Sequence, residues 1–175
     1  MLQEPINAVT IRAATLDDAS AIATIYNHFV RETIVTFEEV EIDGDEIARR
    51  LESVWSASLP WLVAEADGEI VGYTYATKWK ERIGYRFSVE TTVYLAPSAV
   101  GKGTGLALYN ALFPLLEARG VHAAIGGIAL PNDASVALHE KMGMKQVAHF
   151  KQTGFKFDRW IDVVYYERIL GAQPA

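Results

Sequence analysis

The chain has 175 residues, 16 lysines and arginines against 22 aspartates and glutamates, a net charge of −6, and no cysteine. The length favours one domain, the acidic balance disfavours nonspecific nucleic-acid binding, and the absence of cysteine excludes disulfides, thiolate metal sites and a cysteine nucleophile. Charges interrupt every apolar run before the ~20 residues that a membrane-spanning helix needs, and residues 1–10 lack the pattern of a secretory signal. We expect one domain over residues 1–175, with a core at about 9–170, in a cytoplasmic protein.

Hydrophobic spacing predicts the elements of the first half of the chain. A strand is expected at Val9–Ala13, followed by a helix that Asp17 and Asp18 open and a second helix at Asp43–Ser56. Two β-prone runs, Trp61–Ala66 and Ile70–Ala76, flank an Asp-Gly pair, which is typical of a β-hairpin.

The second half alternates strands and helices. The predicted elements are a strand at Phe87–Leu95, a helix from Gly103 to Arg119 with Pro114 inside it, a strand at Ala123–Ile128, a helix at Asn132–Met142, and strands at Lys145–Gln152 and Ile161–Ile169. Antiparallel hairpins and βαβ crossovers occur together, so we predict an α+β (mixed α/β) fold, neither a doubly wound fold nor a sandwich.

A glycine-rich loop, Val100-Gly101-Lys102-Gly103-Thr104-Gly105, lies between a predicted strand and helix. Glycines let the backbone approach a ligand, and free amides at a helix N-terminus attract phosphate oxygens. The spacing fits neither a P-loop nor a dinucleotide fingerprint. A glycine-rich turn without a ligand is the simpler alternative.

A second motif follows the next strand, where Asn132 opens a short helix that carries His139 and ends near Gly143. Asn132 alone could be an ordinary N-cap, and Gly143 an ordinary C-cap. The order of strand, glycine-rich loop, helix, strand, asparagine and short helix is more specific than either residue.

With these motifs in place, the chain resembles the GNAT superfamily of acyl-CoA-dependent N-acyltransferases, and within it the phosphinothricin acetyltransferase-like proteins. The resemblance runs from Val9 to Leu170. It is carried by the segments Ile25–His28, Pro60–Glu65, Trp79-Lys80, Val89–Tyr94, Leu130–Asp133, Leu138–Glu140 and the Gly-x-Lys-x-x-x-Trp-x-Asp-Val pattern at Gly154–Val163. The family's usual Gln or Arg at the start of the loop is replaced by Val100, which has no side-chain donor for a phosphate.

The resemblance implies a central, mostly antiparallel twisted sheet with helices on both faces and a V-shaped cofactor cleft. It implies acetyl-CoA as cosubstrate and a homodimer. No metal is expected, because the four histidines are scattered and no carboxylate cluster suits one. The implied cofactor-binding residues are Val93, Tyr94, Leu95, Gly101, Lys102, Gly103, Thr104, Gly105, Leu106 and Asn132. A backbone amide within Val93–Leu95 is expected to polarise the thioester oxygen.

Acetyl transfer to an amine needs a base, since the ammonium form has no lone pair. The resemblance implies Glu90 and His139 as the catalytic pair. Tyr109 is a spare candidate acid, and packing of its helix is the simpler interpretation of that residue. Which of Glu90 and His139 takes the ammonium proton stays open. Without the resemblance, Glu90 reads as a surface carboxylate and His139 as a hydrogen-bonded helix residue.

The loop before the Glu90 strand is rich in cations. Lys80, Arg82, Tyr85 and Arg86, with Phe37 from an earlier segment, are the candidate substrate-binding residues. Arginine binds carboxylate-like groups in bidentate fashion, which favours a small amino acid or analogue such as phosphinothricin, methionine sulfoximine or methionine sulfone. A solvated charged loop is the alternative.

Three other functions compete with this one. They are acetylation of another amine or a protein N-terminus, non-catalytic binding of acyl-CoA, and generic phosphate binding by an α/β domain. The paired Glu90 and His139 disfavour the second function, and the Asn132 segment disfavours the third.

Overall fold

The computed structural model describes residues 9–171, so the predicted domain limits at residues 1 and 175 lie outside the described residues. Seven strands form one sheet in the order β1-β2-β3-β4-β5-β7-β6. They are β1 (Thr10–Ala13), β2 (Trp61–Ala66), β3 (Glu69–Lys78), β4 (Ser88–Leu95), β5 (Ala123–Ala129), β6 (Lys145–Lys156) and β7 (Arg159–Ile169).

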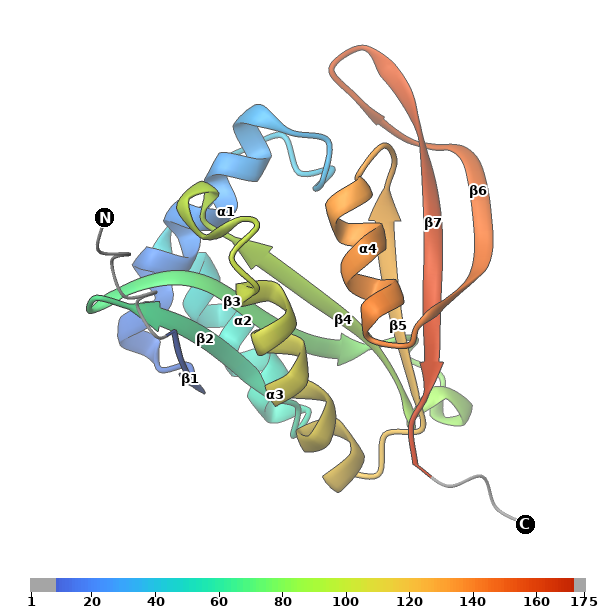
Figure 1. Cartoon of the computed structure of the whole chain (residues 1–175), viewed down its shortest axis with the longest axis horizontal. Coiled ribbons are helices and arrows are strands. Elements are labelled where there is room, and N and C mark those ends of the chain that lie inside the picture. Colours follow the sequence, from blue (N-terminus) through green and yellow to red (C-terminus); the bar gives the residue numbers. More distant parts are fainter. Residues whose placement is uncertain (1–8, 172–175) are drawn as a thin grey trace, which may run out of the picture.

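The sheet is antiparallel at every junction except one. Only β4 and β5 run parallel, and they share just three paired positions. Helices cover both faces: α1 (Ala19–Glu32) and α2 (Gly44–Ser56) lie behind the sheet in Figure 1, and α3 (Thr104–Ala118) and α4 (Asp133–Lys141) in front of it. The predicted α+β fold with a mostly antiparallel sheet is therefore confirmed.

Short 3₁₀ helices mark three of the connections: η1 (Leu16–Asp18), η2 (Ile83–Tyr85) and η3 (Pro97–Ala99). The first one shifts the start of the first long helix from the predicted Asp17 to Ala19. The cause is Asp18, whose carboxylate accepts hydrogen bonds from the Thr15 N–H at 2.8 Å and from both terminal nitrogens of Arg12 at 2.8 Å. The acidic pair thus makes a tight turn before the helix.

The predicted hairpin turn is present between β2 and β3. Asp67 and Gly68 have φ values of 52° and 80°, as a two-residue hairpin with an Asp-Gly turn requires. The C-terminal hairpin differs from prediction, because β6 continues four residues beyond Gln152 to Lys156. Phe157 and Asp158 form its turn at φ values of 51° and 55°, a geometry that this dipeptide does not signal in sequence.

One large apolar cluster joins both faces of the sheet. Its fully buried members include Ile22 and Leu51 behind the sheet and Leu108, Leu112 and Leu116 in front of it. No helix within residues 9–171 has the length and apolar character that a membrane crossing demands. Beyond their three paired positions β4 and β5 diverge, while β4 stays paired with β3 and β5 with β7.

Candidate active site

The site lies where β4 and β5 separate. Their pairing runs from Ser88 opposite Ala123 to Glu90 opposite Ile125, and no later residue of either strand pairs with the other. Both strands continue beyond this point, β4 to Leu95 and β5 to Ala129. The result is the V-shaped opening between adjacent strands that Figure 1 shows.

A cavity of about 270 Å³ occupies this opening. It is bordered by Glu90 from β4, His139 and Asn132 from the α4 region, Tyr109 from α3, and Phe37 from the loop between α1 and α2. The structure thus brings together the two predicted catalytic residues, one predicted substrate residue and three predicted cofactor residues, Val93, Tyr94 and Asn132.

Glu90 is half-buried beside the cavity. Burial raises the pKa of its carboxyl group, and the charge of Lys80 opposes this shift. Among residues 9–171, none donates a hydrogen bond to the carboxylate. A Cβ at Gly127 of β5 would lie 3.4 Å from Glu90 Oε1, an ordinary contact distance, so the carboxylate lies beside the backbone of the neighbouring strand. Such a carboxylate is free to take a proton from a molecule in the cavity.

His139 is almost fully buried, at 3% exposure. Its Nδ1 lies 2.7 Å from the carbonyl oxygen of Ser135, which can only accept, so Nδ1 carries the proton of the neutral ring. Nε2 is then an acceptor and lies 3.4 Å from the hydroxyl of Tyr109. Burial lowers the pKa of His139 below its usual value, which favours this neutral tautomer.

The backbone of β4 faces the opening at alternate residues. A hydrogen bond from Ala96 N to Val71 O (2.8 Å) shows that even-numbered residues of β4 bond to β3. Antiparallel pairs alternate in this way, so the N–H groups of Val93 and Leu95 point away from β3, toward the opening. Tyr94 bonds to β3 instead, and its ring packs on Tyr26 with centroids 5.3 Å apart.

The glycine-rich loop leads into the N-terminus of α3. Gly101 and Gly103 adopt φ values of 76° and 82°, which a residue with a side chain rarely adopts. The first helical hydrogen bond runs from Ala107 N to Gly103 O at 3.0 Å, so the N–H groups of Thr104, Gly105 and Leu106 precede the helical ladder. Lys102 is exposed beside them. These groups are suited to an anion.

Asn132 caps α4, as its simpler interpretation expected. Its Oδ1 accepts the Ser135 N–H at 3.1 Å, and the residue also borders the cavity. The first turn of α3 packs closely on α4, because a Cβ at Gly105 would lie 3.1 Å from Leu138 Cδ2. The two helices that follow β4 and β5 are therefore in direct contact beside the opening.

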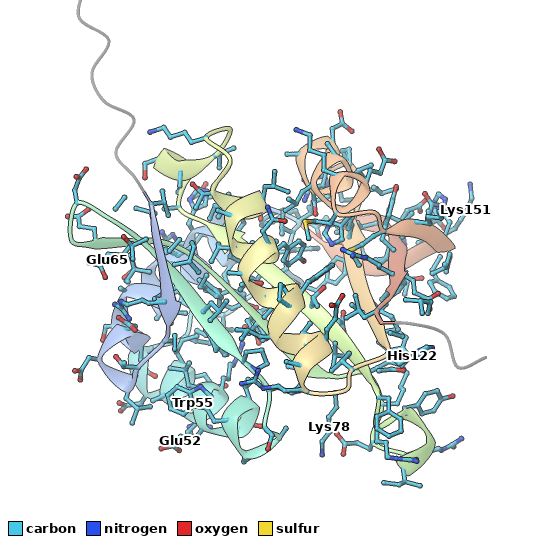
Figure 2. The ribbon with its side chains drawn as sticks, turned by 60° about the horizontal axis from the view of Figure 1, so that its bottom comes forward. Glu52, Trp55, Glu65, Lys78, His122 and Lys151 are labelled. Carbon is cyan, nitrogen blue, oxygen red and sulfur yellow. The ribbon has the colours of Figure 1, made fainter. Side chains whose placement is uncertain are left out.

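The predicted cationic loop lies elsewhere. Lys80, Arg82 and Arg86 line a second cavity of about 360 Å³ that also includes Arg119 and does not include Glu90. Lys78, labelled in Figure 2, borders the same hollow. Tyr85 is 43% exposed and lines neither cavity. The contact of these four residues with an acceptor stays a prediction.

Several residues that line the cavity are not among those that the sequence motifs identify. Tyr165 of β7 lies beside Glu90, whose charge, together with burial, raises the pKa of the Tyr165 hydroxyl. Thr36 and Ser135 also border the cavity. The alternation of β7 could have placed Tyr165 on the face of the sheet that it shares with Val163, but only the β5–β7 pairing brings it to Glu90. Within residues 9–171, no three histidines or carboxylates gather as a metal site would need.

The comparisons with known proteins agree with this geometry. The chain is 44% identical to phosphinothricin N-acetyltransferase of Alcaligenes faecalis over 94% of this chain and 84% of that protein. It is 35% identical to L-methionine sulfoximine/L-methionine sulfone acetyltransferase of Salmonella typhimurium, covering 95% and 98% of the two chains. A phosphinothricin acetyltransferase from Sinorhizobium meliloti, solved in complex with acetyl-CoA, superposes with a TM-score of 0.91 at 35% identity, over 95% of this chain and 93% of that one.

Residues 11–165 match the acetyltransferase (GNAT) domain family. This span contains the diverging strands, the glycine-rich loop, both predicted catalytic residues and the Asn132 cap. The predicted enzyme class is confirmed: the chain belongs to the GNAT family of N-acetyltransferases.

Proposed function

We propose that the protein transfers the acetyl group of acetyl-CoA to the α-amino group of a small amino acid or amino-acid analogue. The observation that carries this proposal is the position of Glu90. It is the last residue of β4 that pairs with β5, and it faces a cavity of only about 270 Å³. Typical small-molecule sites have volumes of ~300–1,000 Å³. A cavity at the lower end favours a small acceptor over a peptide chain.

Acetyl-CoA is proposed to bind along the opening between β4 and β5. The free N–H groups of Val93 and Leu95 suit the amides of a pantetheine arm that lies beside β4, in place of the missing strand. The N–H groups at the start of α3, with Gly101 and Lys102, suit the diphosphate. Two similar proteins were solved with acetyl-CoA, which supports acetyl-CoA as the ligand.

Glu90 is proposed as the base. It takes a proton from the substrate ammonium, directly or through one water, and the neutral nitrogen then attacks the thioester carbon. Its raised pKa makes it a stronger base than an ordinary glutamate, and no other described group competes for its oxygens. The carbon–nitrogen bond forms, a tetrahedral intermediate collapses, and the carbon–sulfur bond breaks.

The proton for the departing thiolate is proposed to come from Tyr109. His139 holds its one proton on Nδ1, where the Ser135 carbonyl binds it, so Nε2 has none to give at neutral pH. The Tyr109 hydroxyl lies 3.4 Å from this nitrogen, and Tyr109 borders the same cavity as Glu90. We infer that His139 orients Tyr109, and that solvent replaces the proton that Tyr109 loses to the thiolate.

The acceptor class rests on relatives as well as on the cavity. The names of two similar proteins specify phosphinothricin and methionine sulfoximine or sulfone, all amino-acid analogues. Phe37 is proposed to form the apolar wall of the acceptor site. Among the predicted cations, Lys80 is the one whose charge acts on Glu90, so it is the cation that we expect to influence a bound carboxylate.

A thiol-release assay tests the proposal. The purified chain is supplied with acetyl-CoA and, in turn, phosphinothricin, methionine sulfoximine, methionine sulfone, a polyamine and a short peptide. We expect turnover with the amino-acid analogues and loss of that turnover in Glu90→Gln. Activity confined to the polyamine or the peptide would contradict the acceptor class, and acetyl-CoA binding without any turnover would indicate a non-catalytic binder.

We also infer that the chain acts as a single domain and assembles as a homodimer in the cytoplasm. The single sheet supports one domain. The β6–β7 hairpin supports self-association, because β6 is an edge strand and the hairpin exposes the large side chains Phe150, Phe155, Phe157 and Trp160. Analytical ultracentrifugation of the wild type and of Trp160→Ser would detect a dimer and its loss, and cell fractionation would locate the protein.

A further inference from the structure

The C-terminal Gly-x-Lys pattern has no part in the chemistry proposed above, yet it contains a buried lysine. Lys156 of β6 is 1% exposed. Its Nζ lies 2.9 Å from the carbonyl oxygen of Thr36 and 3.4 Å from that of Phe29, near the C-terminus of α1. Within the described residues it has no ion-pair partner. Burying a cation is costly unless polar groups bind it. The two carbonyl oxygens offset this cost, and the segment to which they belong indicates what the lysine does.

The two carbonyls belong to the segment that walls the cavity. Phe29 lies in the last turn of α1, and Val35, Thr36 and Phe37 line the same cavity as Glu90. The ammonium of Lys156 therefore ties the far edge of the sheet to the loop between α1 and α2. A cation near a helix C-terminus also interacts favourably with the helix dipole.

Gly154, two residues before Lys156, also contacts the segment that walls the cavity. A Cβ at Gly154 would come closer than 3.0 Å to three ring carbons of Phe37, so the ring rests directly on the backbone of β6. Gly154 and Lys156 point to the same face of the strand, as alternate residues do. One side of β6 thus receives Phe37 and binds Thr36.

Asp162, a further residue of the Gly-x-Lys-x-x-x-Trp-x-Asp-Val pattern, stabilises a bulge in β6. The register of the β6–β7 pairing shifts between Phe150 and Gly154. Asp162 of β7 supports this bulge, because its Oδ1 accepts the Gln152 N–H at 2.9 Å. The bulge bends the strand and re-aims the residues that follow it. It therefore sets where Gly154 and Lys156 meet the loop.

We propose that Lys156 is a positioning residue that sets the acceptor wall Thr36–Phe37 and thereby the affinity for the acceptor. The inference rests on the proposed acceptor site. The lysine does not touch the reacting atoms. Its effect is expected on the acceptor and not on acetyl-CoA, whose proposed binding groups lie on β4 and α3.

The test compares Lys156→Met, which keeps the length of the side chain but removes its donors, with Lys151→Met as the matched control. Lys151 is an exposed lysine of the same strand and points into solvent in Figure 2. We expect Lys156→Met to lower kcat/KM for the acceptor about 10–100-fold, mainly through KM. The dissociation constant for acetyl-CoA, measured by calorimetry, should stay within about twofold of wild type, and Lys151→Met should match wild type. Lys156→Arg, which keeps donors, should recover part of the loss.

A second variant, Gly154→Ala, tests the same inference if Lys156→Met does not fold. Gly154→Ala displaces Phe37 from the same wall without changing a charge, and it should also raise the acceptor KM while preserving acetyl-CoA binding. An unchanged acceptor KM in the folded variants, or an equal loss of acceptor and acetyl-CoA affinity, would overturn the inference. All constants are measured with whichever amine the wild type acetylates best. A failure of the proposed acceptor class is thereby seen in the wild type alone, separately from the role of Lys156.

Discussion

The imidazole of His139 lies directly against the backbone of Gly126, in the strand beneath α4. A Cβ at Gly126 would come closer than 3.0 Å to both Nε2 and Cδ2 of the ring. The glycine thus allows Nε2 to reach the Tyr109 hydroxyl, while the Ser135 carbonyl holds the opposite side of the ring. The position of a buried histidine is therefore determined by the absence of a side chain on the neighbouring strand.

Gly126→Ala should consequently impair catalysis by moving His139. We expect kcat to fall about 10-fold or more, with acetyl-CoA affinity preserved, because small displacements of positioned groups are costly. The measurement is steady-state kinetics with calorimetry. His139→Ala supplies the control: in that background the space is vacant, so adding Gly126→Ala should change kcat little. Independent, additive effects of the two changes would show that Gly126 acts by another route.

Glu90→Gln should remove the base while keeping the shape of the site. We expect kcat at neutral pH to fall about 10²–10⁴-fold. In the wild type, kcat/KM should decline on the acid side with an apparent pKa above 4.5, because burial raises the pKa of the Glu90 carboxyl. This acid limb should be absent from the residual activity of the variant. Nearly full activity in Glu90→Gln would show that another group is the base.

Much of this architecture could be predicted from the sequence. The Asp67-Gly68 hairpin follows from turn chemistry, and the Gly103 and Asn132 helix starts follow from capping rules. The grouping of Glu90 with His139 rests on the resemblance, since 49 positions separate them. They border one cavity because β5 pairs with β4 at Glu90 and also carries Gly126, on which the His139 ring packs. Local patterns carry no information on such non-local pairing.

The failures have physical reasons too. The end of β6 was underestimated because its bulge and its Phe157-Asp158 turn lack the glycine and asparagine that normally signal positive φ. The cations Lys80, Arg82 and Arg86 precede Glu90 closely in sequence and line a different cavity, so their contact with an acceptor stays a prediction. Proximity in sequence therefore did not place them in the Glu90 cavity.

Protonation of His139 should make stability depend on pH. Burial lowers its pKa in the folded state below 6.5, so the unfolded chain binds this proton first as pH falls. The free energy of unfolding should therefore hold its full value above about pH 6.5 and decrease from there down to the folded-state pKa. Urea titrations from pH 8 to pH 5 measure this slope, and His139→Gln should reduce it. If the wild type and His139→Gln show the same pH dependence of the free energy of unfolding, groups other than His139 cause it.

The Asp18 turn should contribute to stability through its charge. Arg12 and the Thr15 N–H bind the carboxylate, which is 9% exposed, and hold the pKa of Asp18 below 3.8. We expect Asp18→Asn to lower the free energy of unfolding by about 1–3 kcal/mol, because it weakens a charge-assisted pair and leaves Arg12 with Glu65 alone. Chemical denaturation measures the loss. Asp17→Asn, at the neighbouring exposed residue, is the control and should change stability by less than about 0.5 kcal/mol.

Val100 offers a gain of function at the cofactor loop. The residue is 55% exposed, it stands at the position where the GNAT loop pattern calls for Gln or Arg, and it lies a few residues before the start of α3. Val100→Arg should place a guanidinium near the proposed diphosphate and tighten acetyl-CoA binding about 3–10-fold, the range expected of one partly exposed charge-assisted hydrogen bond. Calorimetry at two salt concentrations measures it, and the gain should shrink at high salt. Val100→Leu is the uncharged control. Equal affinities for the arginine and leucine variants at low salt would mean that the diphosphate binds away from this loop.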